Sequence, residues 1–321
     1  MKQPVIYIGT IGQSVWRSTD LGDSWKRASG GLFPEADIRA IAVDPSDPSV
    51  VFAGTGNGLY RTADGAETWQ LVGSEMNDLQ IWDIEISEKN PNTIFVGTCP
   101  SDLFKSTDGG KTWIRLDVEL ADECAGGAII PRVTSIAIDP EDDQIVYAGI
   151  EIDGFRRSTD GGKSWETINE GLSSLDIHGI SVVPGQPKKI IVATNNDVCR
   201  TDDLKSWTPL VVKDYLPWSY ARSVFYCPNG ENRVYLGAGN GPPGDEGGVF
   251  YSVDAGDSWE KADLGIVSNS TIWNFAYNGN IDDLIMAYSV SGQIFRSMDH
   301  GNSWQKLTRE FGEVRALAIA S

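Results

Sequence analysis

Seven residues that share one recurring sequence position form the most informative set of side chains in this chain. Each lies two residues before a pair of apolar residues at the start of a predicted strand, and the set is Arg39, Trp82, Thr134, His178, Arg222, Trp273 and Arg315. The guanidinium fork of arginine suits carboxylate, sulfate or phosphate. Tryptophan offers a flat face to sugar or aromatic rings. The set predicts a site for an anionic, carboxylate-bearing small molecule or oligosaccharide.

Candidates for catalysis lie in the same set and beside it. His178 is one of only two histidines and is the candidate acid or base, because imidazole titrates near neutral pH. Glu151 and Asp153 are expected nearby, and Tyr220 precedes Arg222 by two residues. A base beside arginines suits β-elimination from a uronate or hydrolysis of an acidic substrate. One histidine is too few for a convincing zinc site, so we expect neither a metal nor a cofactor.

The same residues also allow a purely structural interpretation. The arginines, to which Arg132 adds a fourth, could pair with local carboxylates, and the tryptophans could simply plug a channel. A pair of carboxylates for glycoside hydrolysis could also come from other loop residues, but the sequence does not fix their separation. The members of that wider set are Glu151, Asp153, Asp102, Asp245 and Glu246.

A repeat shows which elements must position these residues. Seven times the chain has Ser or Thr, then Asp, then Trp five residues after the Asp, most clearly in 106–113 and 158–165. Each unit contains four strand-like segments, which in the second unit are 38–43, 50–54, 58–62 and 68–72. A repeat of this length with four strands per unit is typical of a propeller. We therefore predict an all-β, seven-bladed β-propeller, with 1–321 as a single domain.

The two ends of the chain predict how the ring closes. Residues 7–10 match the second strand of a unit, and residues 314–319 match the first strand. The C-terminal strand should therefore complete the N-terminal blade. Such a clasp would pair strand edges that would otherwise be exposed.

The repeat resembles the Asp-box (BNR) motif of sialidases, sortilin-type receptors, two-propeller xyloglucanases and the photosystem II assembly factors related to Ycf48. This resemblance covers the whole chain and implies a fold rather than one activity. It also implies that the Asp of each repeat organises a turn on the face opposite the working site. Copy five is ambiguous between Asp202 and Asp203, and its turn is expected to be one residue shorter.

The resemblance is compatible with two classes of function, one catalytic and one non-catalytic. Sialidases grip a carboxylate with three arginines but are typically six-bladed, and xyloglucanases need a cleft between two propellers. Ycf48-like proteins are seven-bladed and use an arginine patch to dock, so a protein partner is the non-catalytic alternative. Insertions at 117–132 and 240–248 are both expected on the face away from the repeat turns, where loops carry function.

The composition of the chain disfavours two classes of partner, nucleic acids and membranes. The formal net charge of −19 disfavours nucleic acid, because phosphate backbones would be repelled. No apolar run approaches the length of a membrane span, so no membrane partner is expected. The four cysteines form no CxxC pair and are read as reduced thiols. The N-terminus has no apolar leader, which predicts a cytoplasmic location unless a signal peptide has been removed.

Overall fold

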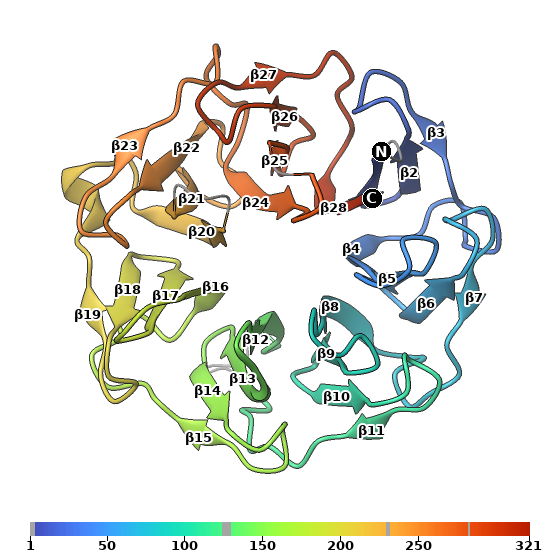
Figure 1. Cartoon of the computed structure of the whole chain (residues 1–321), viewed down its shortest axis with the longest axis horizontal. Coiled ribbons are helices and arrows are strands. Elements are labelled where there is room, and N and C mark those ends of the chain that lie inside the picture. The colour runs from blue at the N-terminus through green and yellow to red at the C-terminus, as the bar shows by residue number, and fades with distance from the viewer. Residues whose placement is uncertain (1–3, 124–129, 229–231, 282) are drawn as a thin grey trace.

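The computed structural model describes residues 4–123, 130–228, 232–281 and 283–321. Seven four-stranded antiparallel sheets surround a central channel, as Figure 1 shows. The first strand of each blade lines the channel and the fourth lies at the rim. The prediction of an all-β, seven-bladed propeller is therefore confirmed.

The strands of the first four blades, each given from the channel outward, have the following bounds. They are β28 (Val314–Ala320), β1 (Val5–Thr10), β2 (Ser14–Ser18) and β3 (Lys26–Arg27); β4 (Ile38–Val43), β5 (Val51–Thr55), β6 (Gly58–Thr62) and β7 (Gln70–Leu71); β8 (Gln80–Ile86), β9 (Ile94–Cys99), β10 (Leu103–Ser106) and β11 (Ile114–Arg115); β12 (Val133–Asp139), β13 (Asp142–Ile150), β14 (Gly154–Ser158) and β15 (Glu166–Thr167).

The other three blades follow the same order, with one 3-10 turn, Val212–Asp214, between two of them. They are β16 (Ile177–Val183), β17 (Lys189–Thr194), β18 (Val198–Thr201) and β19 (Thr208–Pro209); β20 (Tyr220–Cys227), β21 (Arg233–Gly239), β22 (Gly247–Ser252) and β23 (Glu260–Lys261); β24 (Ile272–Tyr277), β25 (Ile285–Ser289), β26 (Ile294–Ser297) and β27 (Gln305–Lys306).

The second strand of each blade is an apolar run rather than an alternating one, because both of its faces are covered by neighbouring blades. In β5 and β9 every residue is buried. The hydrophobic core consists of clusters that join adjacent blades, and one of them contains Tyr7 of the first blade with Val51 and Trp69 of the second. The burial of these faces between blades holds the ring together.

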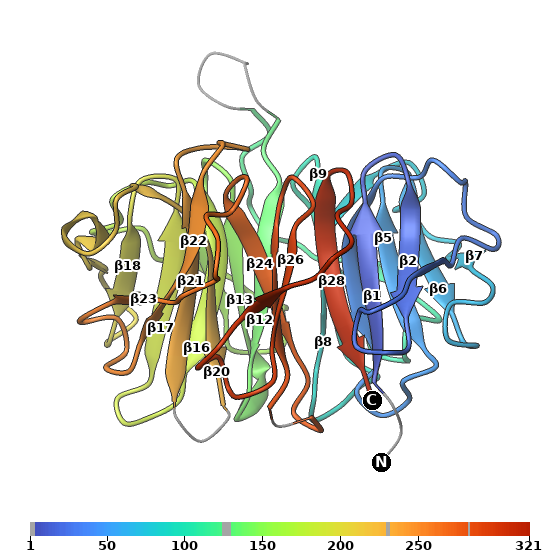
Figure 2. The same ribbon diagram turned by 90° about the horizontal axis from the view of Figure 1, so that it is seen from above.

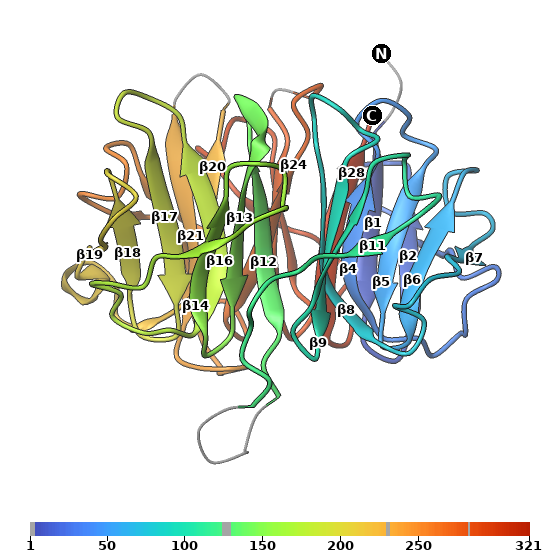
Figure 3. The same ribbon diagram turned by 90° about the horizontal axis from the view of Figure 1, so that it is seen from below.

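The closing strand lies where the two chain ends predicted it. β28 pairs antiparallel with β1, from Val5 opposite Ala320 to Thr10 opposite Val314. Figures 2 and 3 show the C-terminal end of β28 on one face of the disc, and β12 beginning at the opposite face. The strand supplied by the C-terminus therefore occupies the channel-lining position of the N-terminal blade.

The repeat forms a tight turn after the third strand of every blade. In the third copy, the Asp108 carboxylate accepts hydrogen bonds from the backbone N–H and hydroxyl of Thr112, at 2.9 and 2.6 Å, and from the hydroxyl of Ser106. These bonds lower the pKa of Asp108 to about 2. Gly110 follows with a φ of 81°, a conformation that glycine adopts without strain. The aspartates of these turns are thus engaged in holding the backbone.

In the fifth copy of the repeat, Asp203 is the aspartate that organises the turn. Its carboxylate accepts the backbone N–H groups of Lys205 and Ser206 at 2.9 and 3.2 Å. Leu204 takes the left-handed position with a φ of 54° and bonds to Thr201 three residues back, whereas the other turns use a four-residue spacing. Asp202 instead pairs with Arg200 at 3.2 Å.

Candidate functional site

A backbone irregularity recurs at the start of every first strand. In each blade the ladder between the first and second strands skips one residue; in β4, for example, Ile38 pairs with Thr55 and Ala40 with Gly54, so Arg39 has no partner. The skipped residues in all seven blades are the predicted set, Arg39, Trp82, Thr134, His178, Arg222, Trp273 and Arg315. Such β-bulges redirect a side chain and occur next to active sites.

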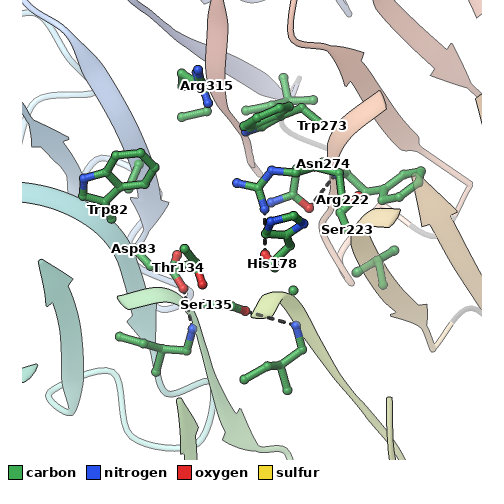
Figure 4. Close-up of a pocket in the computed structure, with 18 of the residues that line it drawn as sticks. Trp82, Asp83, Thr134, Ser135, His178, Arg222, Ser223, Trp273, Asn274 and Arg315 are labelled. Carbon is green, nitrogen blue, oxygen red and sulfur yellow. Dashed lines mark hydrogen bonds between the residues drawn. The ribbon is translucent and has the colours of Figure 1, made fainter. Parts of the chain in front are cut away.

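The bulged residues surround a cavity at one mouth of the channel. All seven of these ring residues line it, and it encloses about 330 Å³. Figure 4 shows the Trp82 ring on one side of this mouth cavity and the Trp273 ring on the other. A space of this size holds a small ligand or the end of a longer one.

Trp273 is stacked by two arginines. The Arg222 guanidinium lies 4.1 Å from the centre of the Trp273 ring, and that of Arg315 lies 4.3 Å away. Arg315 pairs with Glu313 at 2.5 Å. Among the described residues, no carboxylate lies within 4 Å of Arg222, although this side chain is only 9% exposed. Burial, and to a smaller extent Arg315, lowers the pKa of Arg222.

Trp82, on the other side of the mouth cavity, is also stacked by two arginines. The guanidinium groups of Arg132 and Arg39 lie 4.4 and 5.0 Å from its ring centre. Arg132 pairs with Glu151, and Arg39 pairs with Asp37 at 3.4 Å. The predicted pairing of arginines with local carboxylates is therefore observed at three of the four arginines, and Arg222 is the exception.

Both ring nitrogens of His178 already face protein groups. Nδ1 lies 2.9 Å from the carbonyl oxygen of Ala221 and must donate there, because a carbonyl only accepts. Nε2 lies 3.4 Å from Oδ1 of Asp176, and the Tyr220 ring centre is 5.2 Å from that of the imidazole. The Asp176 oxygen is buried without a hydrogen bond in the described part of the chain. His178 is thus held between a backbone carbonyl and a carboxylate.

The predicted residues Glu151, Tyr220 and Arg132 do not line the mouth cavity, but they lie close enough to its lining residues to interact with them. Burial raises the pKa of Glu151 and of Tyr220, and both interact electrostatically with Asp176 and Arg222. The Thr134 hydroxyl is bonded to the carbonyl of Ile177 at 2.5 Å. These contacts leave the Thr134 hydroxyl little freedom to act on a ligand.

The expectation for Asp153 is corrected, because this residue does not line the mouth cavity. Its carboxylate accepts the Ala121 N–H at 2.9 Å, which holds the start of the insertion, and pairs with Arg156 at 2.7 Å. Asp102, Asp245 and Glu246 are also absent from the cavity lining. Residues 124–129 of the insertion lie outside the described residues.

Two acidic residues that we did not predict as site residues lie inside the channel. Asp83 and Glu85 on β8 both line the mouth cavity. Asp83 accepts the N–H groups of Ile136 and Ile84 at 2.6 and 3.0 Å, yet burial raises its pKa to about 6. The sequence contained a signal for both residues. In each first strand, the residue before the apolar pair and the residue between its two members face the channel.

No group of three or more His, Cys, Asp or Glu side chains that could hold a metal ion occurs among the described residues. No helix in the described part of the chain is long and apolar enough to cross a membrane.

Comparisons with known proteins agree with this architecture. A family model described as sortilin, neurotensin receptor 3, matches residues 13–145. A xyloglucanase of Paenibacillus sp. is 26% identical over 232 residues, which are 61% of this chain and 22% of that protein. The photosystem II assembly lipoprotein Ycf48 of Synechococcus sp. (strain CC9902) is 22% identical over 284 residues, 87% of this chain and 78% of that protein.

Among solved structures, one described as Ycf48 bound to D1 peptide superposes with a TM-score of 0.60 at 15% identity. The match covers 85% of this chain and 81% of that one. The protein is a seven-bladed propeller similar to those of xyloglucanases and Ycf48. It spans about a quarter of the length of the first xyloglucanases that it matches. This propeller therefore corresponds to one part of such an enzyme and to most of Ycf48.

Proposed function

We propose that the mouth cavity binds the carboxylate of a small molecule or oligosaccharide, with Arg222 as the principal contact. The observation that carries this proposal is a buried arginine that lines a cavity without a neutralising carboxylate. An isolated buried charge is costly unless a partner compensates it. An anionic ligand would supply that partner.

The surroundings of Arg222 support an anion there. Arg39 and Arg315 line the same cavity, and the charge of Arg315 contributes to lowering the pKa of both Arg222 and Arg39. A bound carboxylate would relieve this repulsion. Trp273 and Trp82 would form the walls, on which a sugar or aromatic ring stacks. Three arginines line this mouth in a protein of net charge −19, and among the described residues Arg222 is the one of the three with no carboxylate within 4 Å.

Turnover of the ligand by hydrolysis or elimination is the further step of this proposal. Asp83 supports it, because a carboxyl group with a pKa of about 6 can donate a proton near neutral pH. The similarity to xyloglucanases supports a carbohydrate substrate. His178 and Glu151 are less favourable donors, since His178 already donates to the Ala221 carbonyl and Glu151 pairs with Arg132. Tyr220 is less favourable because burial raises the pKa of a phenol, which already lies well above neutral pH.

A thermal-shift screen of carboxylates tests the binding. The panel contains monocarboxylates, dicarboxylates, uronic acids and uronate oligosaccharides, and the proteins are the wild type, Arg222→Ala and His178→Ala. Arg115→Ala is the matched control, because Arg115 forms an exposed pair with Asp102 on the rim. We expect a carboxylate that raises the Tm of the wild type and of the control, but not of Arg222→Ala. An equal shift in Arg222→Ala contradicts the proposal.

Docking of a protein segment is the second candidate function. It is supported by the match to Ycf48, which covers most of both chains. The same arginine-lined mouth would then receive an acidic side chain of the partner. Specific retention of a partner protein from lysate by the wild type and not by Arg222→Ala, with no carboxylate hit in the screen, would favour docking. The cytoplasmic location and the single-domain organisation are still predictions from the sequence.

A further inference from the structure

The channel has a second cavity at its other end, with the opposite electrostatic character. It encloses about 530 Å³, and among the described residues the charged ones that line it are Glu85 and Glu88. Among the described residues, no lysine or arginine nitrogen lies within 4 Å of either carboxylate. We call this space the exit cavity. The channel thus has arginines at one mouth and glutamates at the other.

Aromatic rings form one wall of the exit cavity. The Phe225 and Phe275 rings are stacked, with centres 6.1 Å apart and planes inclined by 21°. The Tyr277 ring centre lies 6.1 Å from that of Phe225. Phe225 and Tyr277 are only partly buried. The rings therefore still have surface to offer to a ligand.

The position of Phe225 and Glu85 in their strands explains why both side chains line the channel. Each occupies the position between the two apolar residues of its first strand, which faces the channel axis. The other blades have mostly small residues at this position, among them Ala42, Ala137, Ala276 and Ala318. The two large side chains therefore project across a channel lined by methyl groups, and both line the mouth cavity and the exit cavity.

We propose that the exit cavity binds a small organic ammonium ion. Two carboxylates would attract the charge, and the aromatic faces would bind its methyl or methylene groups by cation–π contact, with the residues Glu85, Glu88, Phe225, Phe275 and Tyr277. Aromatic faces beside carboxylates are the usual surroundings of a bound ammonium group. A hard metal ion is a poorer fit, because it needs six or more oxygen ligands.

The crowding of acids on β8 supports a cation at this position. Burial raises the pKa of Glu85 well above its usual range, and the neighbouring charges of Asp83 and Glu88 raise it further. An ammonium ion beside Glu85 would offset both effects. Glu85 and Phe225 also border the mouth cavity, but the ammonium site needs no anion bound at Arg222.

Calorimetric titration with choline tests the proposal, with uncharged 3,3-dimethylbutan-1-ol as the control of equal shape. We expect choline to bind saturably and at least about 10-fold more tightly than the alcohol. Glu85→Gln should weaken choline binding about 10-fold, and Phe225→Leu, which keeps an apolar side chain without a π face, about 5-fold. Glu75→Gln removes an exposed carboxylate elsewhere and should leave binding unchanged.

Several outcomes would overturn the ammonium site. These are the absence of saturable choline binding, equal affinity for the alcohol, or displacement of choline by millimolar calcium at constant ionic strength. If Glu85→Gln does not fold, Glu88→Gln takes its place, since Glu88 is exposed and its replacement leaves the channel packing intact. Unchanged choline affinity in a folded Glu88→Gln protein also contradicts the proposal.

Discussion

Arg222 donates a 2.8 Å hydrogen bond to the backbone carbonyl of His178, the ring residue of the preceding blade. His178 in turn contacts the carbonyl of Ala221, the residue before Arg222, at 2.9 Å. The two bulges are thus tied together by reciprocal side-chain to backbone contacts. This pairing fixes the guanidinium of Arg222 in the cavity while leaving its charge without a carboxylate.

The first prediction separates the stability of Arg222 from its role in binding. Arg222→Met keeps an unbranched side chain, although a shorter one, and removes the buried charge, and the His178 carbonyl loses one donor. We expect the free energy of unfolding to stay within about 1 kcal/mol of the wild type or to rise, because the two changes oppose each other. Urea denaturation measures this quantity.

The same variant should lose any stabilisation that carboxylates give the wild type. Arg222→Lys is the informative companion, because it keeps the charge but not the two-pronged geometry. A loss of more than about 3 kcal/mol in Arg222→Met would show that the arginine is mainly a structural support.

The spacing of residues in the sequence predicted the seven mouth residues but not the β-bulges that place them there. The position two residues before each apolar pair could be read from the sequence, and the seven residues at that position, from Arg39 to Arg315, all line the mouth cavity. The bulge could not be read, because it depends on pairing with a second strand. Register across strands is set by tertiary structure and turn geometry rather than by local pattern.

The roles of individual acids were the least predictable part of the site. Asp153 is close to Glu151 in sequence, but its charge is used by Arg156 and by the insertion backbone. Asp83 was not among the predicted site residues, and it accepts an N–H from Ile136 of the neighbouring blade. The contacts with Ala121 and Ile136 join residues more than 30 positions apart, so no local pattern indicates them.

The second prediction concerns the pH dependence of stability through Asp83. Its pKa is about 6 in the folded protein and close to 4 when unfolded, so the folded state binds the proton more tightly. The stabilisation from this group is therefore complete below pH 4 and is lost as the pH rises through 6. The difference between the two pKa values corresponds to about 3 kcal/mol at most.

Asp83→Asn removes that titration. We expect the difference in unfolding free energy between the variant and the wild type to move in favour of the variant by up to about 3 kcal/mol from pH 4 to pH 7.5. Urea denaturation at four pH values measures it. A constant difference across this range would show that Asp83 does not titrate with a raised pKa.

The third prediction uses the fifth repeat turn, where two neighbouring aspartates differ in role. Asp203→Ala removes the acceptor for the N–H groups of Lys205 and Ser206, and Asp202→Ala removes a surface ion pair with Arg200. We expect the first variant to lower the Tm by roughly 2 to 4 °C and the second by less than about 1 °C. Differential scanning calorimetry compares them, and the reverse order would reassign the turn to Asp202.

The fourth prediction concerns the closing strand. A chain that ends at Gly312 lacks β28, whose residues Val314, Leu317 and Ile319 are buried. Their loss removes several kcal/mol of apolar burial and exposes the edge of β1, in a protein whose whole stability is of the order of 5–15 kcal/mol. We expect the truncated protein to lack a cooperative thermal transition, whereas removal of Ser321 alone should have no effect.

A circular permutant distinguishes loss of the strand from loss of the terminal clasp. Val5 lies opposite Ala320 in the ladder, so a short turn can join them as an ordinary hairpin. New ends at the exposed Gly73, between β7 and β8, leave every blade continuous. We expect this permutant to fold with a single cooperative transition and to keep carboxylate binding at Arg222, because the β28–β1 pairing is retained. A permutant without a cooperative transition, like the truncated chain, would contradict this expectation. It would mean that the propeller needs a blade built from both termini, and not only the presence of β28.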